Sequence, residues 1–130
     1  MAAWRNINWT LQPHPCSVDV PVWTSVQKLE QSWKVNIEEY IGKGGFGNAI
    51  DNRYKQIGDW LRSESMIWMP AISFDDSGTP AFTDGRHRFA WIRDHQADTL
   101  QIAVPPDQVL EFKRRFGTEV TISKWFDKNV

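Results

Sequence analysis

Cysteine is nearly absent from this chain, because Cys16 is the only one among 130 residues. A single cysteine excludes an internal disulfide and a structural zinc cluster built on thiolates. Cys16 lies in the proline-rich stretch PHPCS, without the basic helix terminus that activates a thiol. We therefore expect it to be unreactive.

Long apolar runs are also lacking. No stretch approaches the roughly 20 residues that cross a bilayer, and the opening residues MAAWRNINW contain no hydrophobic signal core. These two absences predict a cytoplasmic protein that does not insert into membranes.

The chain has no excess of charge of either sign. Fifteen Lys and Arg residues stand against sixteen Asp and Glu residues, which gives a formal net charge of -1. The protein as a whole is thus not attracted to nucleic acid or to an anionic membrane, and any DNA binding must depend on a local basic patch. Tryptophan, by contrast, is abundant, with eight residues along the chain. We expect most of them to anchor the core, and a minority near the ends to face a partner.

The length allows one hydrophobic core, so we expect a single domain over 1–130. Within it, 1–16 is predicted to be an N-terminal arm and 117–130 a C-terminal tail or strand. Patterns of apolar residues and turn residues predict, in chain order, a strand at 17–23, a helix at 24–33 that IEEYI extends or repeats, a helix at 48–64 capped by Asn48, strands at 66–74 and 80–83 joined by a turn at 75–79, a helix at 85–96, a strand at 100–104 and a helix at 105–117.

This order of elements predicts an α/β (α+β) fold, with a small mixed sheet and flanking helices. The strand–helix–strand order over 80–104 further predicts that the strands at 80–83 and 100–104 are parallel and joined by a right-handed crossover.

The segment AFTDGRHRFAWIRDH (81–95) has an unusual strand-to-helix junction, DGRHR. Asp84 is placed to cap the helix, and Gly85 allows the backbone to turn and a ligand to approach closely. The basic residues Arg86, His87 and Arg88 oppose the helix dipole, so their clustering points to a function rather than to stability. Backbone donors and guanidinium groups both suit phosphate, and the junction therefore predicts a phosphate site. In the alternative interpretation, the two arginines face solvent or pair with nearby aspartates.

DGRHRFAW followed by IAVPP resembles the core motif of the ParB/sulfiredoxin-like superfamily over roughly 66–106. In that superfamily a glycine turn and a basic helix start bind nucleotide phosphates. The resemblance implies ATP or another nucleoside triphosphate as ligand, with Mg²⁺ arriving with the nucleotide rather than at a metal site built by the protein. Arg86 stands where sulfiredoxins have their catalytic cysteine, so sulfinic-acid reduction is not expected. The DNA-reading domain of ParB proteins is absent from the sequence.

YIGKGGFGNAI, RYKQIGDWL and FTDGRHRFAWIRDH together look like the plasmid fertility inhibition factor family, small ParB/sulfiredoxin-like proteins that block conjugative DNA transfer. The resemblance implies a component of a conjugative secretion machine as partner, and ATPase or DNase activity. Asp84 and His87 are then the candidate catalytic residues. Asp84 would act as base or only as cap, and His87 in proton transfer or as a phosphate donor. The alternative is a non-catalytic inhibitor that binds a protein of a DNA-transfer or defence machine.

Three further residues are candidate phosphate ligands. GKGGFGN (42–48) is no P-loop, because no Ser or Thr follows Lys43. Lys43 and Gly45 could nevertheless form a second wall of the phosphate pocket, or simply belong to a connector. Arg53, early on the following helix, either reaches the pocket or faces solvent. The run KRR (113–115) is normally a solvated helix face, but with Arg86, Arg88 and Arg93 it could form a groove for a DNA backbone.

Overall fold

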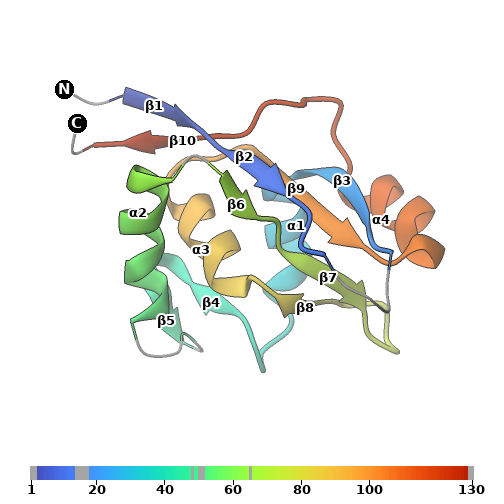
Figure 1. Ribbon diagram of the computed structural model, residues 1–130. Coiled ribbons are helices and arrows are strands. Elements are labelled where there is room, and N and C mark those ends of the chain that lie inside the picture. The colour runs from blue at the N-terminus through green and yellow to red at the C-terminus, as the bar shows by residue number, and fades with distance from the viewer. Residues whose placement is uncertain (1–2, 14–17, 48, 50–51, 65, 129–130) are drawn as a thin grey trace.

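The computed structural model describes residues 3–13, 18–47, 49, 52–64 and 66–128 (Figure 1). Within these residues, four α-helices are interspersed with short strands, which confirms the α/β (α+β) class with a small mixed sheet. In chain order the elements are β1 (Ala3–Asn6), β2 (Asn8–Thr10), β3 (Val20–Ser25), α1 (Val26–Trp33), β4 (Ile41–Gly42), the 3₁₀ turn η1 (Lys43–Gly45), β5 (Phe46–Gly47), α2 (Arg53–Ser63), β6 (Met66–Trp68), β7 (Ala71–Phe74), β8 (Pro80–Asp84), α3 (Arg86–Asp94), β9 (Thr99–Val104), η2 (Pro106–Gln108), α4 (Val109–Phe116) and β10 (Lys124–Asp127).

The central sheet has the strand order β3-β9-β7-β8. β9 runs antiparallel to β3 and parallel to β7, while β8 is antiparallel to β7. The predicted parallel pairing of 80–83 with 100–104 is therefore wrong, since β7 lies between these strands and β8 runs opposite to β9. The predicted turn at 75–79 does form, with Asp75 Oδ1 accepting from the backbone N–H of both Ser77 and Thr79 at 2.9 Å. The error arises because β9 pairs with β7, the other strand of this hairpin, and not with β8.

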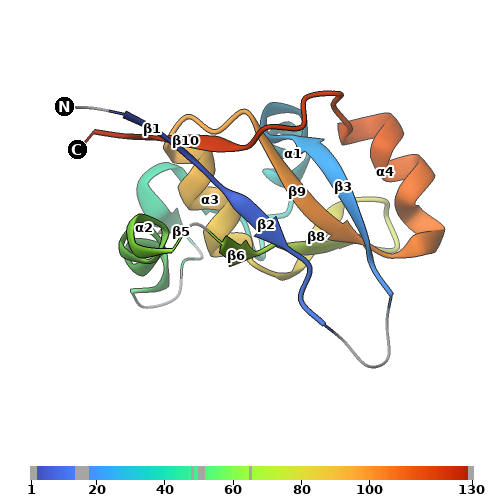
Figure 2. The same cartoon turned by 45° about the horizontal axis from the view of Figure 1, so that its top comes forward.

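The helices bury their apolar side chains against the sheet around one aromatic cluster. The indole of Trp33 meets Phe82 edge-on at a centroid distance of 4.9 Å and Phe89 at 5.4 Å. Trp33 and Phe89 are fully buried, as is Trp125. In Figure 2, β2 passes in front of the central sheet and α1 lies behind it. The prediction that most tryptophans anchor the core is confirmed, because Trp33, Trp91 and Trp125 are buried and Trp9 and Trp60 pack against the core. Trp4, near the N-terminus, is 48% exposed, and Trp68, far from either end, is 39% exposed.

Two predicted helices change their bounds. α1 forms as predicted, with the Ser25 hydroxyl capping it by accepting from the backbone N–H of Lys28 at 3.3 Å. IEEYI does not continue it, because the chain passes through turns and enters β4. The helix predicted at 48–64 begins at Arg53. The predicted cap, Asn48, lies outside the described residues, as does Cys16.

The strand predicted at 66–74 is two strands. Pro70 has no N–H to donate to a neighbouring strand, and it lies in the two-residue interruption between β6 and β7. The carbonyl of Pro70 accepts from Ala103 N at 2.8 Å, and Met69 N donates to Thr10 O at 2.8 Å. β6 therefore pairs in parallel with β2, away from the central sheet.

The predicted N-terminal arm contains β1 and β2, and the region predicted as C-terminal tail or strand contains β10. β1 and β10 are antiparallel partners. The buried carboxylate of Asp127 ties this pair to α2, because it accepts from Arg5 Nε at 2.7 Å and from Arg62 Nε at 3.3 Å.

A loop closes the β8 edge of the central sheet. Glu39, which precedes β4, places its Oε1 where it accepts from the backbone N–H of Phe82 at 2.8 Å and from Trp33 Nε1 at 2.7 Å. The amide of Asn36 donates to the carbonyl of Pro80 at 3.3 Å. Among the described residues, no helix has the length and apolar composition that crossing a bilayer requires.

Candidate functional site

The junction between β8 and α3 is shaped by Gly85. Its φ of 85° lies in the left-handed region, and a Cβ at this position would lie 2.9 Å from Pro70 Cα. Glycine is thus required by both conformation and space. The prediction that Asp84 caps the helix is wrong, because Gly85 occupies the cap position and α3 has no side-chain cap. The Asp84 carboxylate extends one turn forward instead and accepts from Arg88 Nη2 at 3.0 Å.

A pocket of about 450 Å³ opens between α2 and the start of α3. We call it the α2–α3 pocket. α2 contributes one of its faces, and the β8–α3 junction the opposite wall. The lining residues are Arg53, Gln56, Ile57, Trp60, Asp84, Gly85, His87 and Arg88. Arg53 and most of the predicted junction residues are therefore brought to one cavity.

Arg88 is held in this pocket with unused hydrogen-bonding capacity. Its side chain is only 13% exposed and makes the ion pair with Asp84 through Nη2. Its Nε is buried and has no hydrogen-bond partner within the described part of the chain. A buried donor without a partner is costly, and the cost falls when an anionic ligand accepts from it.

His87 also lines the α2–α3 pocket, and its pKa is lowered there. Its side chain is buried, with the residue 7% exposed. Burial, followed by the positive charges of Arg86, Arg53 and Arg88, lowers the pKa of His87 from 6.5 to about 4. His87 is therefore neutral at pH 7, kept so first by its burial and then by the three guanidinium groups around it.

Three predicted phosphate ligands do not line the α2–α3 pocket. The Arg86 guanidinium donates through Nη1 to the carbonyl of Glu39 at 3.0 Å. Lys43 lines a separate hollow beside Asp94. A Cβ at Gly45 would lie 2.8 Å from the Tyr54 ring, so this glycine serves packing.

The glycine-rich segment already binds a carboxylate of the protein itself. The backbone N–H of Gly44 donates to Asp94 Oδ2 at 2.9 Å, and the Tyr54 hydroxyl donates to the same oxygen at 2.6 Å. Asp94 is the last residue of α3, at the opposite end of that helix from the α2–α3 pocket. The length of α3 thus separates the glycine-rich segment from Gly85.

The remaining arginines of the proposed DNA groove are engaged by protein groups. Arg93 is 10% exposed and pairs with Glu30 at 3.0 Å and with Asp94 at 2.9 Å. Arg115 donates to the carbonyl of Gly78 at 2.7 Å, and Arg114 pairs with Glu111. Of the predicted arginines, Arg53 and Arg88 line the α2–α3 pocket.

Gln56 and Trp60 belong to the pocket but were not predicted. The spacing of residues could have identified them. Arg53, Gln56 and Trp60 stand at i, i+3 and i+7, so they share one face of a helix.

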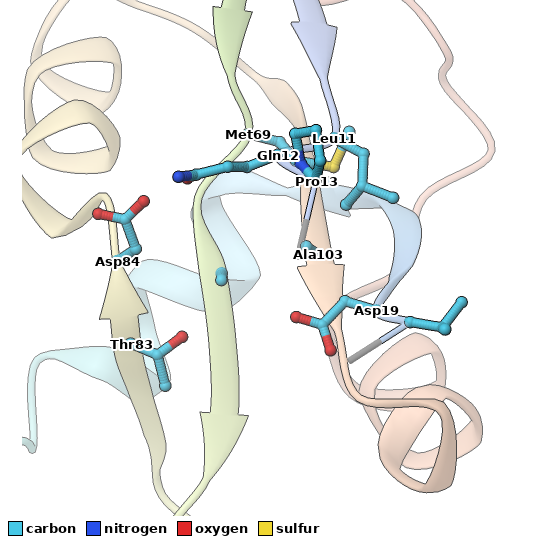
Figure 3. Close-up of a pocket in the computed structure, with 10 residues that line it drawn as sticks. Leu11, Gln12, Pro13, Asp19, Met69, Thr83, Asp84 and Ala103 are labelled. Atoms are coloured by element: carbon cyan, nitrogen blue, oxygen red, sulfur yellow. The ribbon is translucent and has the colours of Figure 1, made fainter. Parts of the chain in front are cut away.

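A second hollow of about 590 Å³ borders the first. It lies between the N-terminal segment and the ends of β7, β8 and β9, and we call it the arm–sheet pocket. Figure 3 shows its wall residues, with the Gln12 side chain extending across β7 toward Asp84. Its lining residues are Leu11, Gln12, Pro13, Val18, Asp19, Met69, Ala71, Thr83, Asp84 and Ala103. Asp84 therefore borders both pockets.

The described residues contain no group of three or more His, Cys, Asp or Glu side chains arranged to hold a metal ion. Comparison with protein-family models, curated proteins and solved structures found no match to this chain.

Proposed function

We propose that this protein binds a nucleotide and that the phosphates lie in the α2–α3 pocket. One observation carries the proposal: Arg53, His87 and Arg88 converge on a cavity at the start of α3, and the Nε of Arg88 is buried there with no hydrogen-bond partner among the residues that the structure describes. The start of a helix favours negative charge through its dipole. A pocket of about 450 Å³ also lies within the usual range for small ligands.

The chemistry of the lining residues supports phosphate over other anions. Arg53 and Arg88 offer planar donor forks that match phosphate oxygens. Neutral His87 supplies a further hydrogen bond without adding charge. In this proposal Mg²⁺ arrives with the nucleotide and is held mainly by its phosphates.

The biological role follows the resemblance to ParB/sulfiredoxin-like plasmid fertility inhibition factors. In this role the nucleotide-bound protein acts in the cytoplasm on a component of a conjugative secretion machine and blocks DNA export. Hydrolysis of ATP or of DNA would use neutral His87 as proton acceptor, with the Arg53 and Arg88 charges stabilising the transferring phosphoryl group.

Binding without turnover is the second candidate. Among the described residues that line the α2–α3 pocket, Asp84 is the only carboxylate, and it is paired with Arg88. A general base must be available to accept a proton, and this ion pair opposes that role. In the second candidate the protein is a non-catalytic inhibitor that nucleotide binding holds in a partner-binding form.

Isothermal titration of ATP and CTP with Mg²⁺ tests the site. Arg53→Gln and Arg88→Gln should each weaken binding by about 10- to 100-fold, because each removes a charge-assisted hydrogen bond. Arg114→Gln is the matched control, since it removes the same charge from an exposed position on α4. Arg86→Gln should change the affinity less than Arg88→Gln does.

Two results would contradict the assignment. Absence of nucleotide binding by the wild-type protein would refute the function, and unchanged affinity in the Arg88→Gln variant would refute the site. A phosphate-release assay on wild type and His87→Gln then separates an ATPase from a non-catalytic binder. Plasmid transfer frequency, measured in donor cells that express either protein, tests the inhibitory role.

A further inference from the structure

We infer that the nucleoside part of the ligand occupies the arm–sheet pocket, on the far side of Asp84 from the phosphates. This inference rests on the proposed nucleotide function and specifies how the ligand lies. Asp84 is common to the two lining sets. A ligand larger than a phosphate group can thus extend from one pocket into the other past a single side chain.

Charge fixes the direction in which such a ligand lies. The arm–sheet pocket is lined by Asp19 and Asp84, and its lining within the described part of the chain includes no Lys or Arg. The α2–α3 pocket has Arg53 and Arg88 instead. Phosphate is repelled by the first and attracted by the second, so the uncharged part of a nucleotide is the part that suits the arm–sheet pocket.

The polar groups of the arm–sheet pocket suit a nucleoside. Carboxylates accept hydrogen bonds, and the hydroxyls of a ribose and the exocyclic amine of a base donate them. Asp19 and Asp84 supply such acceptors, and Figure 3 shows the Gln12 amide extending toward Asp84. The pocket therefore presents acceptors to a ligand that is rich in donors.

Its apolar groups suit the flat ring of a base. Leu11 and Met69 lie on the wall, as do Ala71 and Ala103, whose small side chains leave room for a ligand. Met69 is buried, at 4% exposure. An apolar wall combined with a few polar groups is the usual composition of a small-molecule site.

The test compares ATP with inorganic tripolyphosphate, which carries the phosphates without the nucleoside. Wild-type protein should bind ATP about tenfold or more tightly than tripolyphosphate. Asp19→Asn should weaken ATP binding by about three- to tenfold, because an amide replaces an acceptor of full charge. The same variant should bind tripolyphosphate with unchanged or slightly higher affinity. Asp76→Asn, in the exposed turn at 75–79, is the matched control.

The experiment distinguishes a wrong placement of the nucleoside from a wrong assignment of nucleotide binding. Equal affinity of wild-type protein for ATP and tripolyphosphate, with both weakened by Arg88→Gln, would overturn this inference and leave the proposed function standing. Trp60→Leu tests the competing placement of the base in the α2–α3 pocket. A selective loss of ATP affinity in that variant, with Asp19→Asn unaffected, would also overturn the inference. Binding of neither ligand would refute the proposed function itself.

Discussion

The titration of His87 measures the combined effect of burial and of nearby charges at the start of α3. The pKa of His87 is lowered from 6.5 to about 4 by burial and by the charges of Arg86, Arg53 and Arg88. Each pKa unit corresponds to about 1.36 kcal/mol, so this difference is worth about 3 kcal/mol of folding free energy. The sign follows from proton binding, because the unfolded chain takes up a proton on this imidazole at a pH where the folded protein does not. The contribution is complete above pH 6.5 and is lost as the pH falls from 6.5 to 4.

Two measurements check this prediction. The first is the ¹H–¹³C NMR titration of the histidine rings, with His87→Gln used to assign the resonance among the three histidines of the chain. The second is urea denaturation between pH 7 and pH 4.5, in which the wild-type protein should lose more stability than His87→Gln does. A His87 pKa of 6.5 or higher in the free protein would refute the argument that this site carries an unbalanced positive potential.

The same titration in the presence of ligand tests the proposed site. A phosphate group bound by Arg53 and Arg88 stabilises the protonated imidazole, so the pKa of His87 should rise when ATP is added. A pKa that does not move at saturating ATP would place the phosphates elsewhere in the molecule.

Two further predictions concern stability, measured by urea denaturation. Gly58→Ala should destabilise the protein by about 1–3 kcal/mol, because the new Cβ would lie 2.8 Å from Trp91 Cζ2 and must push α2 away from α3. Helix propensity alone would instead make the variant more stable, and such a gain would contradict this packing. Glu39→Ala should lower the free energy of unfolding by about 2–5 kcal/mol, because Trp33 Nε1 and the backbone N–H of Phe82 both lose their acceptor. A decrease below about 0.5 kcal/mol would show that water replaces the carboxylate there.

Local patterns in the sequence predicted most helices and strands. They did not predict the order of the strands in the sheet, which depends on pairing between distant segments. Phe89 and Ile92 lie three residues apart in the helix predicted at 85–96, and both are fully buried, because helical periodicity is a local property. The position of β7 between β8 and β9 was not predicted. It depends on which strand pairs with the free edge of a hairpin, and no local pattern encodes that choice. The break at Pro70 did have a signal, since proline cannot donate to a ladder.

The candidate site was likewise predicted in part, in its location but not in the orientation of each side chain. The junction Asp84–Arg88 was recognised because basic residues at a helix start contradict the dipole. Arg86 and Arg88 are nearly equivalent in the sequence, yet only Arg88 faces the pocket, while Arg86 reaches the carbonyl of Glu39. That difference arises from their positions around the helix relative to a loop that is about 47 residues away in the chain. The sequence could not locate that loop.

The closed edge of the central sheet limits how this molecule can associate. An exposed edge strand is a template on which another chain can add a strand, and this is a route to domain swapping and to fibrous aggregates. At β8 the side chains of Glu39 and Asn36 occupy backbone groups of Phe82 and Pro80 that an incoming strand would need. The loop before β4 therefore keeps this edge from recruiting a second chain.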